Sequence, residues 1–475
     1  MRVAVVGTGY VGLVTGTCLA SVGHRVTCVD LLADRVAAIN RGEPPIHEPK
    51  LEDLLQEAIT EGRLNASTDL REAVASSQIS LIAVGTPFAG DAIDLSQVAA
   101  AAGQIGEALG RASDYHVVVV KSTVVPGTTD TLVAQTLEKA SRRRLGDFGL
   151  CMNPEFLRES SAIDDFMDPD RIVVGQWDAR SGQALAELYQ PFHCPKIFTT
   201  LRNAELIKYA SNALLATLVS FSNEIAALCE ATPGTDIEVV MQELHLDRRL
   251  SPVLESRRIT PGILSYLRAG CGFGGSCLPK DVNALRAYAR GRGVKPDLLD
   301  AVMAVNNKRP TQLVDLAEQT LGSLRKAEIA VLGLAFKPGT DDIRDSPALA
   351  IINHLLDRGA AVRVYDPVAT KTAAAVMKNR VTFGSTPTEV VREADAVLIA
   401  TAWPDFQTWD WADLCQGMRR PVIVDGRNAL RGIAWPPQVV YVTIGRTVHQ
   451  GKTATPLERA EVMAAHSPLL DGAPG

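Results

Sequence analysis

The chain has 475 residues, too many for one hydrophobic core, and this length suggests about three domains. Hydrophobic residues make up 46% of it and charged residues 21%, as in an ordinary globular protein, and the net charge of −6 argues against a nucleic-acid or acidic-membrane partner. No run reaches the roughly 18 uncharged apolar residues of a membrane span, and the N-terminus lacks a signal-peptide cleavage region. The eight cysteines form no Cys-x-x-Cys pair, so we expect no metal site, and their usage fits a reducing cytoplasm.

The first thirty residues carry a dinucleotide-binding pattern. A strand is predicted over 2–6, a helix over 13–22 and a second strand over 25–29, with Gly7-x-Gly9-x-x-Gly12 between the first strand and the helix. The first glycine permits the turn, the second lets the backbone approach a pyrophosphate, and the third lets helix and strand pack closely. The alternative is a glycine turn that only links strand and helix.

Asp30 ends the second strand, where it would accept hydrogen bonds from the adenosine ribose hydroxyls. This favours NAD over NADP, although Arg35 lies close by. Further strands over 79–84 and 117–120 are followed by Thr86 and Thr123, which are either cofactor contacts or simple turn and cap residues. A strand over 171–175 is predicted to close this first domain.

A loop follows the apolar residues 148–152. It contains Pro154 and the carboxylates Glu155 and Glu159, so it is either an active-site loop or a solvated one. Residues 203–231 then predict a long helix that joins two lobes and offers a dimer surface. Lys208 and Asn212 share one face of this helix and need partners there, either a substrate and an active-site cysteine or an internal hydrogen bond.

Four glycines precede Cys277 between residues 270 and 277, and Pro279 then suits the first turn of a helix that ends at Gly291 or Gly293. A cysteine at a helix N-terminus is favoured as a thiolate, and Lys280 adds positive charge. With the Asp281 carboxylate close by, Cys277 is a candidate nucleophile. A purely structural cysteine is the alternative. A further helix is predicted over 298–321.

From residue 326 the early pattern repeats, with strands predicted over 328–333, 362–366, 396–401 and 422–425. The loop after the first of these lacks the glycine set, so we expect no second dinucleotide there. Lys337, Arg344 and Arg427 instead suggest a phosphate-bearing substrate, with plain surface charge as the alternative. The predicted fold class is α/β, with two doubly wound, Rossmann-like domains joined by a long central helix and a small helical domain. The expected divisions are 1–200, 201–322, 323–445 and a poorly ordered tail, 446–475.

In combination, these motifs resemble the UDP-glucose/GDP-mannose dehydrogenase family over residues 1–445. The resemblance implies that Cys277 is the nucleophile and Lys208 stabilises an oxyanion, while Asn212 and Asp281 position water with Glu155 and Thr123. The NAD-binding residues on this basis are Gly7, Gly9, Val11, Gly12, Asp30, Arg35, Thr86, Thr123, Glu155, Lys280 and Arg344. The substrate-binding residues are Glu155, Phe156, Leu157, Arg158, Glu159, Lys208, Asn212, Tyr266, Leu267, Arg268, Ala269, Gly270, Gly274, Lys337 and Arg427.

The reaction that the resemblance implies is a four-electron oxidation of a nucleotide sugar, from primary alcohol to carboxylate, by a homodimer or higher homo-oligomer that uses NAD twice. Ser160 stands where the family commonly has glycine. Arg258 occupies the place of an arginine that contacts the neighbouring subunit's substrate, but the segment after it is longer than the short form, as in GDP-mannose dehydrogenases. The competing classes are a two-electron dehydrogenase of the hydroxyacid type and a non-enzymatic NAD-binding protein.

Overall fold

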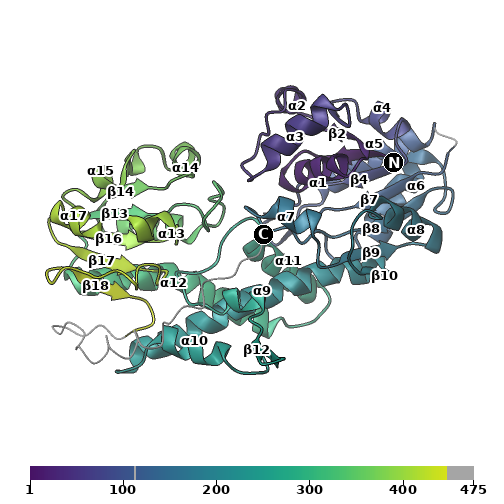
Figure 1. Ribbon diagram of the computed structural model, residues 1–475. Helices are drawn as coiled ribbons and strands as arrows, with labels where there is room; N and C mark the ends of the chain where they lie inside the picture. The colour runs from purple at the N-terminus through teal and green to yellow at the C-terminus, as the bar shows by residue number, and fades with distance from the viewer. Residues whose placement is uncertain (112–113, 447–475) are drawn as a thin grey trace.

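The computed structural model describes residues 1–111 and 114–446, and the tail predicted from residue 446 lies outside them except for its first residue. Two α/β lobes lie side by side, and helix α9 (Leu201–Ala231) runs from one toward the other along a common side (Figure 1). The predicted fold class, two Rossmann-like sheets joined by a long helix and further central helices, is confirmed.

The first lobe contains an eight-stranded sheet in the order β10-β9-β8-β7-β4-β1-β2-β3. Six strands are parallel, and β9 and β10 run against them. The sequence missed β10 because it lies at the sheet edge, where only one side needs apolar residues and most of its side chains are exposed. The bounds are β1 (Arg2–Val6), β2 (Arg25–Val29), β3 (Leu64–Ser67), β4 (Ile79–Ile82), β7 (Val117–Val120), β8 (Gly149–Met152), β9 (Ile172–Gln176) and β10 (Lys196–Thr200).

Helices cover both faces of this sheet, which explains the nearly continuous apolar run of β1. Val3 and Val5 pack on the face that carries α1, α3, α7 and α8, whereas Ala4 and Val6 pack on the face that carries α4, α5 and α6. The bounds are α1 (Tyr10–Ser21), α2 (Ala33–Asn40), α3 (Leu51–Thr60), α4 (Leu70–Ala75), α5 (Ser96–Leu109), α6 (Ala134–Ser141), α7 (Ala162–Met167) and α8 (Ala179–Leu188), with short strands β5 (Phe88–Ala89) and β6 (Ala92–Ile93) and the π-helical turn η1 (Thr129–Val133).

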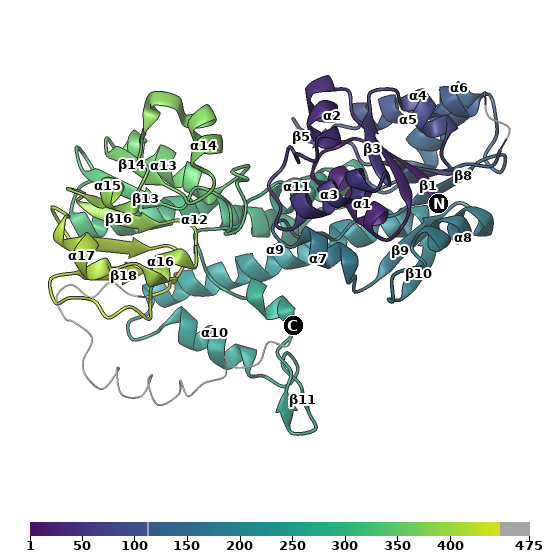
Figure 2. The ribbon, with the colours of Figure 1, turned by 45° about the horizontal axis from the view of Figure 1, so that its top comes forward.

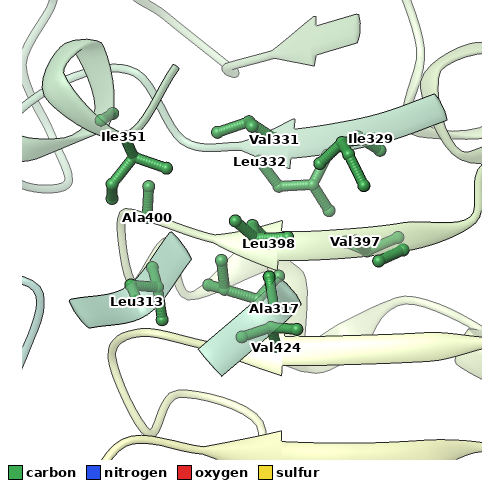
Figure 3. Close-up of a cluster of buried hydrophobic side chains, with 14 of the residues drawn as sticks. Leu313, Ala317, Ile329, Val331, Leu332, Ile351, Val397, Leu398, Ala400 and Val424 are labelled. Carbon is green, nitrogen blue, oxygen red and sulfur yellow. The ribbon is translucent and has the colours of Figure 1, made fainter. Parts of the chain in front are cut away.

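The second lobe contains a six-stranded parallel sheet in the order β15-β14-β13-β16-β17-β18. Helix α12 packs on it through Leu313 and Ala317, which meet Leu398 and Val424 in the core (Figure 3). The strands are β13 (Glu328–Leu332), β14 (Ala361–Tyr365), β15 (Thr382–Phe383), β16 (Ala396–Ile399), β17 (Val422–Asp425) and β18 (Val440–Thr443). The helices are α13 (Pro347–Asp357), α14 (Thr370–Met377), η3 (Lys378–Arg380), α15 (Pro387–Val391), α16 (Asp405–Thr408) and α17 (Trp411–Gln416).

The central elements are α9, α10 (Ile237–His245), η2 (Gly262–Tyr266), α11 (Leu278–Gly291) and α12 (Asp297–Leu321), with a hairpin of β11 (Val253–Leu254) and β12 (Arg257–Arg258) that projects from the body (Figure 2). Helix α9 begins after Thr200, whose Oγ1 accepts a hydrogen bond from Asn203 N at 3.2 Å. Within the described ranges, α9 is the one helix long and apolar enough to span a membrane by length and composition. Here it packs on β9, α11 and α12 and buries Glu205, Lys208 and Asn212, so it is the central core helix.

Candidate active site

The glycine turn between β1 and α1 has the geometry of a phosphate-binding turn. Gly7 has φ +97°, and a Cβ there would lie 2.8 Å from the carbonyl oxygen of Ala83. A Cβ on Gly12 would lie 1.9 Å from the carbonyl oxygen of Gly7, so only glycine permits this packing. A Cβ on Gly9 would meet no atom within 4 Å, and no side chain caps the start of α1. The N–H groups of the first turn of α1, including that of Val11, are therefore available to an anion.

Asp30 lies at the end of β2, beside a hollow lined in part by Arg35 and Pro45. Its Oδ2 accepts hydrogen bonds from the N–H and hydroxyl of Thr8 at 3.1 and 2.6 Å, and its Oδ1 accepts one from the N–H of Leu32 at 3.1 Å. Burial raises the pKa of Asp30, but these hydrogen bonds and Arg35, 3.5 Å away, bring it below the ordinary value. Asp30 is thus an ionised, oriented acceptor that fits a ribose diol.

Thr86 and Thr123 follow neighbouring strands, β4 and β7, and the hydroxyl of Thr86 donates to the carbonyl oxygen of Thr123 at 2.9 Å. This bond holds the two loops together at the carboxyl edge of the sheet, beside the glycine turn. With the open space over Gly9 and the carboxylate of Asp30, the residues present fit a dinucleotide.

A cavity of about 780 Å³ lies where the two lobes meet α9, in the size range of small-molecule sites. Its lining comes from the loop after β8, from α9 and η2, from the cysteine loop (residues 270–277) and from the first loop of the second lobe. The predicted site residues that line it are Glu155, Phe156, Leu157, Arg158, Glu159, Lys208, Asn212, Tyr266, Gly274, Cys277 and Lys337. Segments far apart in the sequence therefore converge on one cavity.

Cys277 is half-buried immediately before α11, in the wall of this cavity. The turn ahead of it depends on glycine: a Cβ on Gly274 would lie 2.2 Å from the carbonyl oxygen of Asp345, and Gly275 has φ +85°. Burial raises the pKa of the Cys277 thiol above its ordinary value, although the nearby Lys208 ammonium lowers it. Desolvation thus acts against the thiolate that Lys208 and the helix N-terminus favour, and the thiolate stays a prediction.

Lys208 and Glu155 form a buried ion pair, with 3.0 Å between Nζ and Oε1. Burial raises the pKa of Glu155, but Lys208 and the N–H of Leu157 bring it below the ordinary value. Burial lowers the pKa of Lys208, but Glu155 and the neighbouring Cys277 bring it above the ordinary value. Each charge therefore keeps the other ionised beside the cysteine, and Lys208 can also act on a negative charge in the cavity.

Asp281 is buried one turn after Cys277. Its Oδ2 accepts a hydrogen bond from Asn212 Nδ2 at 2.6 Å, and its Oδ1 accepts one from Lys280 Nζ at 2.6 Å. Asn212 therefore has an internal partner, and it also lines the cavity, so its predicted contact with a substrate stays a prediction. Lys280, expected to contact NAD, is tied to Asp281.

Four predicted substrate contacts, Leu267, Arg268, Ala269 and Gly270, are absent from the cavity lining. The backbone of Gly270 is instead bonded to buried side chains. Its N–H donates to Asn223 Oδ1 at 2.8 Å, and its carbonyl oxygen accepts from Arg309 Nε at 3.0 Å. These bonds anchor the start of the cysteine loop on α9 and α12.

Arg427, another predicted substrate contact, likewise lies outside the cavity lining. Its guanidinium donates to the carbonyl oxygens of Ala400 and Gly272 at 2.7 and 3.0 Å, which joins the second sheet to the cysteine loop. Arg258 donates within its own hairpin base, to the carbonyl oxygens of Leu246 and Ser251 at 2.7 and 3.0 Å. Both arginines thus hold backbone of their own chain.

Glu159 joins the first lobe to the second. Its carboxylate accepts hydrogen bonds from Ser276 at 3.0 Å and Thr340 at 3.4 Å and lies 3.6 Å from Arg344, while Lys337 Nζ donates to its backbone carbonyl. Burial raises the pKa of Glu159 to about 7. Arg344, expected to contact NAD, is mostly exposed at this junction.

Three buried side chains in the same cavity lining as Glu155, those of Lys121, Asn153 and Tyr189, have no role predicted from the sequence. Lys121 Nζ donates to Asn153 Oδ1 at 2.9 Å, and the hydroxyl of Tyr189 donates to the same oxygen at 2.6 Å. Burial lowers the pKa of Lys121 to about 8. Lys121 directly follows the strand predicted over 117–120, but only the fold shows that all three side chains line the cavity.

The second lobe repeats the glycine turn but fills it with its own side chains. Gly333 has φ +90°, as Gly7 has its positive φ in the first lobe. Asp366, at the position of Asp30, accepts hydrogen bonds from the N–H groups of Leu334 and Ala335 at 2.7 and 3.1 Å and from Trp403 Nε1 at 3.1 Å. Asp366 thus holds two N–H groups of its turn and an indole, whereas Asp30 holds one N–H of its turn, that of Thr8.

A glycine turn that fits a dinucleotide in the first lobe, with a cavity between the two lobes, is the arrangement of a dinucleotide-dependent oxidoreductase. The chain belongs to the UDP-glucose/GDP-mannose dehydrogenase family: the family's NAD binding domain matches residues 1–193, its central domain 202–308 and its UDP binding domain 330–432. The family resemblance and the prediction of an NAD-dependent enzyme are confirmed.

Named relatives cover nearly the whole chain. UDP-glucose 6-dehydrogenase TuaD of Bacillus subtilis is 42% identical over 90% of this chain and 89% of its own length. The solved structure of a UDP-glucose dehydrogenase from Pyrobaculum islandicum is 40% identical, with a TM-score of 0.85 over 94% of this chain and 98% of that one. That of GDP-mannose dehydrogenase from Pseudomonas aeruginosa is 34% identical, with a TM-score of 0.52 over 93% and 99%.

Proposed function

We propose that this chain is an NAD-dependent UDP-glucose 6-dehydrogenase. It converts UDP-glucose, two NAD and one water to UDP-glucuronate, two NADH and three protons. The observation that carries the proposal is Cys277 in the wall of the interlobe cavity, beside the buried Lys208–Glu155 pair. The greater similarity to the UDP-glucose enzymes than to the GDP-mannose enzyme supports glucose as the sugar. We assign residues 1–200 to NAD, 201–322 to the catalytic centre and 323–445 to the nucleotide sugar.

The glycine turn and Asp30 would hold NAD, which when bound would supply the hydride acceptor for the sugar C6 in each of two oxidations. In the first, water held near Asp281 takes the hydroxyl proton and the alcohol becomes an aldehyde. After this water has passed the first proton on to solvent, the Cys277 thiol loses its own proton to it as the sulfur adds to the aldehyde carbon. Lys208 and Asn212 stabilise the oxyanion of the resulting thiohemiacetal, because both face the cavity and are fixed by carboxylate partners.

The second oxidation converts the thiohemiacetal to a thioester on Cys277. Water attacks the thioester carbon, the carbon–sulfur bond breaks, and the thiol is restored as the carboxylate leaves. Glu155, held ionised by Lys208, lines the cavity close to Cys277 and can orient this water. A cysteine is needed because it traps the aldehyde and opens a route to the acid.

The stoichiometry of NADH tests this proposal. We expect two NADH per UDP-glucose consumed, and higher kcat/KM with UDP-glucose than with GDP-mannose or the N-acetyl relatives of either. One NADH per substrate would instead identify a two-electron dehydrogenase, and no NADH with any of them would leave a non-enzymatic NAD-binding protein. A higher kcat/KM with GDP-mannose than with UDP-glucose would identify GDP-mannose as the substrate.

Substitution of the cysteine tests the nucleophile. We expect Cys277→Ser to lower kcat for UDP-glucuronate formation by at least about 10³-fold, since a serine hydroxyl is a poor nucleophile without a base. Cys271→Ser is the matched control in the same loop, where Cys271 Sγ donates to the carbonyl oxygen of Ala400 at 3.3 Å, and it should keep two NADH per substrate. Unchanged product formation by Cys277→Ser would make Cys277 structural.

We also propose that the protein is a homodimer in the cytoplasm. An apolar stripe on α9, formed by Leu214, Phe221 and Leu228, stays exposed, and its members are seven residues apart as in a helix–helix seam. All eight cysteines are free thiols, which fits a reducing compartment.

A further inference from the structure

Glu48 is a buried carboxylate that the proposed mechanism does not use. It lies between α2 and α3 with 6% of its surface exposed. Its Oε2 accepts hydrogen bonds from the Tyr10 hydroxyl and from the N–H of Ser160 at 2.8 Å, and its Oε1 accepts one from the N–H of Ala162 at 2.7 Å. A carboxylate with this little exposure is kept by such partners, because an unpaired one would be costly.

The partners of Glu48 belong to the two ligand-binding segments. Tyr10 is the first residue of α1, directly after Gly9, so its backbone faces the dinucleotide and its side chain points to Glu48. Ser160 and Ala162 directly follow Glu159, the residue that joins the cavity to the second lobe. Burial and the bond to Glu48 raise the pKa of Tyr10, so the phenol keeps its proton and donates.

The segment that Glu48 holds has a strained backbone and a close neighbour. Ser160 has φ +68°, an unfavourable conformation for a residue other than glycine. From the other side, Gly339 packs so closely that a Cβ on it would lie 2.8 Å from Ser160 Cβ. The bonds to Glu48 therefore hold this strained turn on the first lobe, next to the bonds that Glu159 makes to the second lobe.

We propose that Glu48 is a positioning residue that links the dinucleotide turn to the substrate loop through Tyr10, so that each ligand strengthens the binding of the other. The inference rests on the proposed function for the identity of the second ligand. A phosphate on the first turn of α1 fixes the Tyr10 backbone, and the phenol bond passes this constraint to Glu48 and to the N–H groups of the loop. Linkage then requires the nucleotide sugar to tighten NADH by the same factor.

Tyr10→Phe tests the link, because it removes one hydroxyl and leaves the two backbone bonds of Glu48 in place. Calorimetry gives the Kd of UDP-glucose with and without saturating NADH. In the wild type we expect NADH to lower this Kd at least about fivefold, and in Tyr10→Phe by less than about twofold, with the Kd in the absence of NADH unchanged within about twofold. The same ratio in both proteins, or no coupling in the wild type, overturns the proposal.

Lys50→Met is the matched control. It breaks the exposed Lys50–Asp164 pair, which joins the same segment to α7 at 2.6 Å, and should leave the coupling ratio at the wild-type value. A ratio near one in Lys50→Met would show that any disturbance of the segment suffices and would overturn the specific role of Glu48.

Hydrogen exchange separates this inference from the proposed function, since it needs only NADH. We expect NADH to slow exchange of the Ser160 and Ala162 amides in the wild type at least about fivefold, and to change it little in Tyr10→Phe and Glu48→Gln. Equal protection in all three proteins overturns the link. If UDP-glucose neither binds nor reacts while this pattern is seen, the substrate assignment has failed and the link stands.

Discussion

At the scale of single residues, the site depends on charges that are buried together. Lys208 and Glu155 each have less than a tenth of their surface exposed, so neither is stabilised by water. Their attraction, rather than solvent, keeps both ionised beside Cys277. The loss of one partner therefore leaves the other charge buried and unpaired.

Lys208→Met should destabilise the fold by about 3–5 kcal/mol at pH 7, because it leaves Glu155 buried and uncompensated. Urea unfolding would measure this change, and the double variant Lys208→Met/Glu155→Gln should recover at least half of the lost free energy of unfolding. A cost no larger than that of exposed Lys50→Met would contradict the prediction.

The pKa of Glu155 in the folded protein is below its unfolded value. The contribution of Glu155 to stability is therefore present above the unfolded pKa and is lost as the pH falls through the folded pKa.

Glu159 should have the opposite pH dependence. Its pKa is raised by burial to about 7, so its contribution to stability is fully present below the unfolded pKa near 4.5 and is lost as pH rises through 7. Between pH 5 and pH 8 the wild type should lose about 2–3 kcal/mol relative to Glu159→Gln, which cannot ionise. Urea unfolding of both proteins at the two pH values checks this, and parallel pH profiles would rule it out.

At the scale of elements, the periodicity of the sequence predicted the strands and helices whose burial is uniform along their length. The opening strand is buried on both faces, and the strand, glycine turn and helix around it were predicted from the continuous apolar run. The edge strands β10 and β18 were missed, because an edge makes weaker demands on side chains. The burial of Cys277 could not be predicted either, because the segments that line the cavity around it lie far from it in the sequence.

The cysteine loop is held by side chains that lie far from it in the sequence. Asn306 of α12 accepts a hydrogen bond from the N–H of Phe273 at 2.8 Å and donates to the carbonyl oxygen of the same residue at 3.1 Å. Its role could not be predicted, because a lone asparagine in a helix has no distinguishing pattern.

Asn306→Ala should cost about 1–3 kcal/mol, since it leaves the buried backbone groups of Phe273 unpaired. It should also lower kcat more than it raises KM, because the loop places Cys277 and not the nucleotide. Steady-state kinetics and urea unfolding check both parts, with the exposed Asn203→Ala as control. A change in KM alone would show that the loop acts in substrate binding.

At the scale of the whole molecule, the α9 stripe predicts how two copies associate. A glutamate at Phe221 together with one at Leu228 would place two charges in the proposed seam, so Phe221→Glu/Leu228→Glu should sediment as a monomer where the wild type is a dimer. Val376→Glu, at an exposed apolar position on α14 in the second lobe, should remain dimeric. Equal sedimentation of all three proteins would place the interface elsewhere.

The filled turn of the second lobe has a consequence for protein engineering. The carboxylate of Asp366 accepts hydrogen bonds from two N–H groups of the loop after β13 and from the indole of Trp403. Glycines grafted into residues 334–339 would therefore not by themselves recreate a cofactor turn, because Asp366 would still be bonded to the N–H groups of residues 334 and 335 and to Trp403. A redesign for a second redox cofactor has to remove Trp403 and supply new partners for Asp366 before it changes the loop.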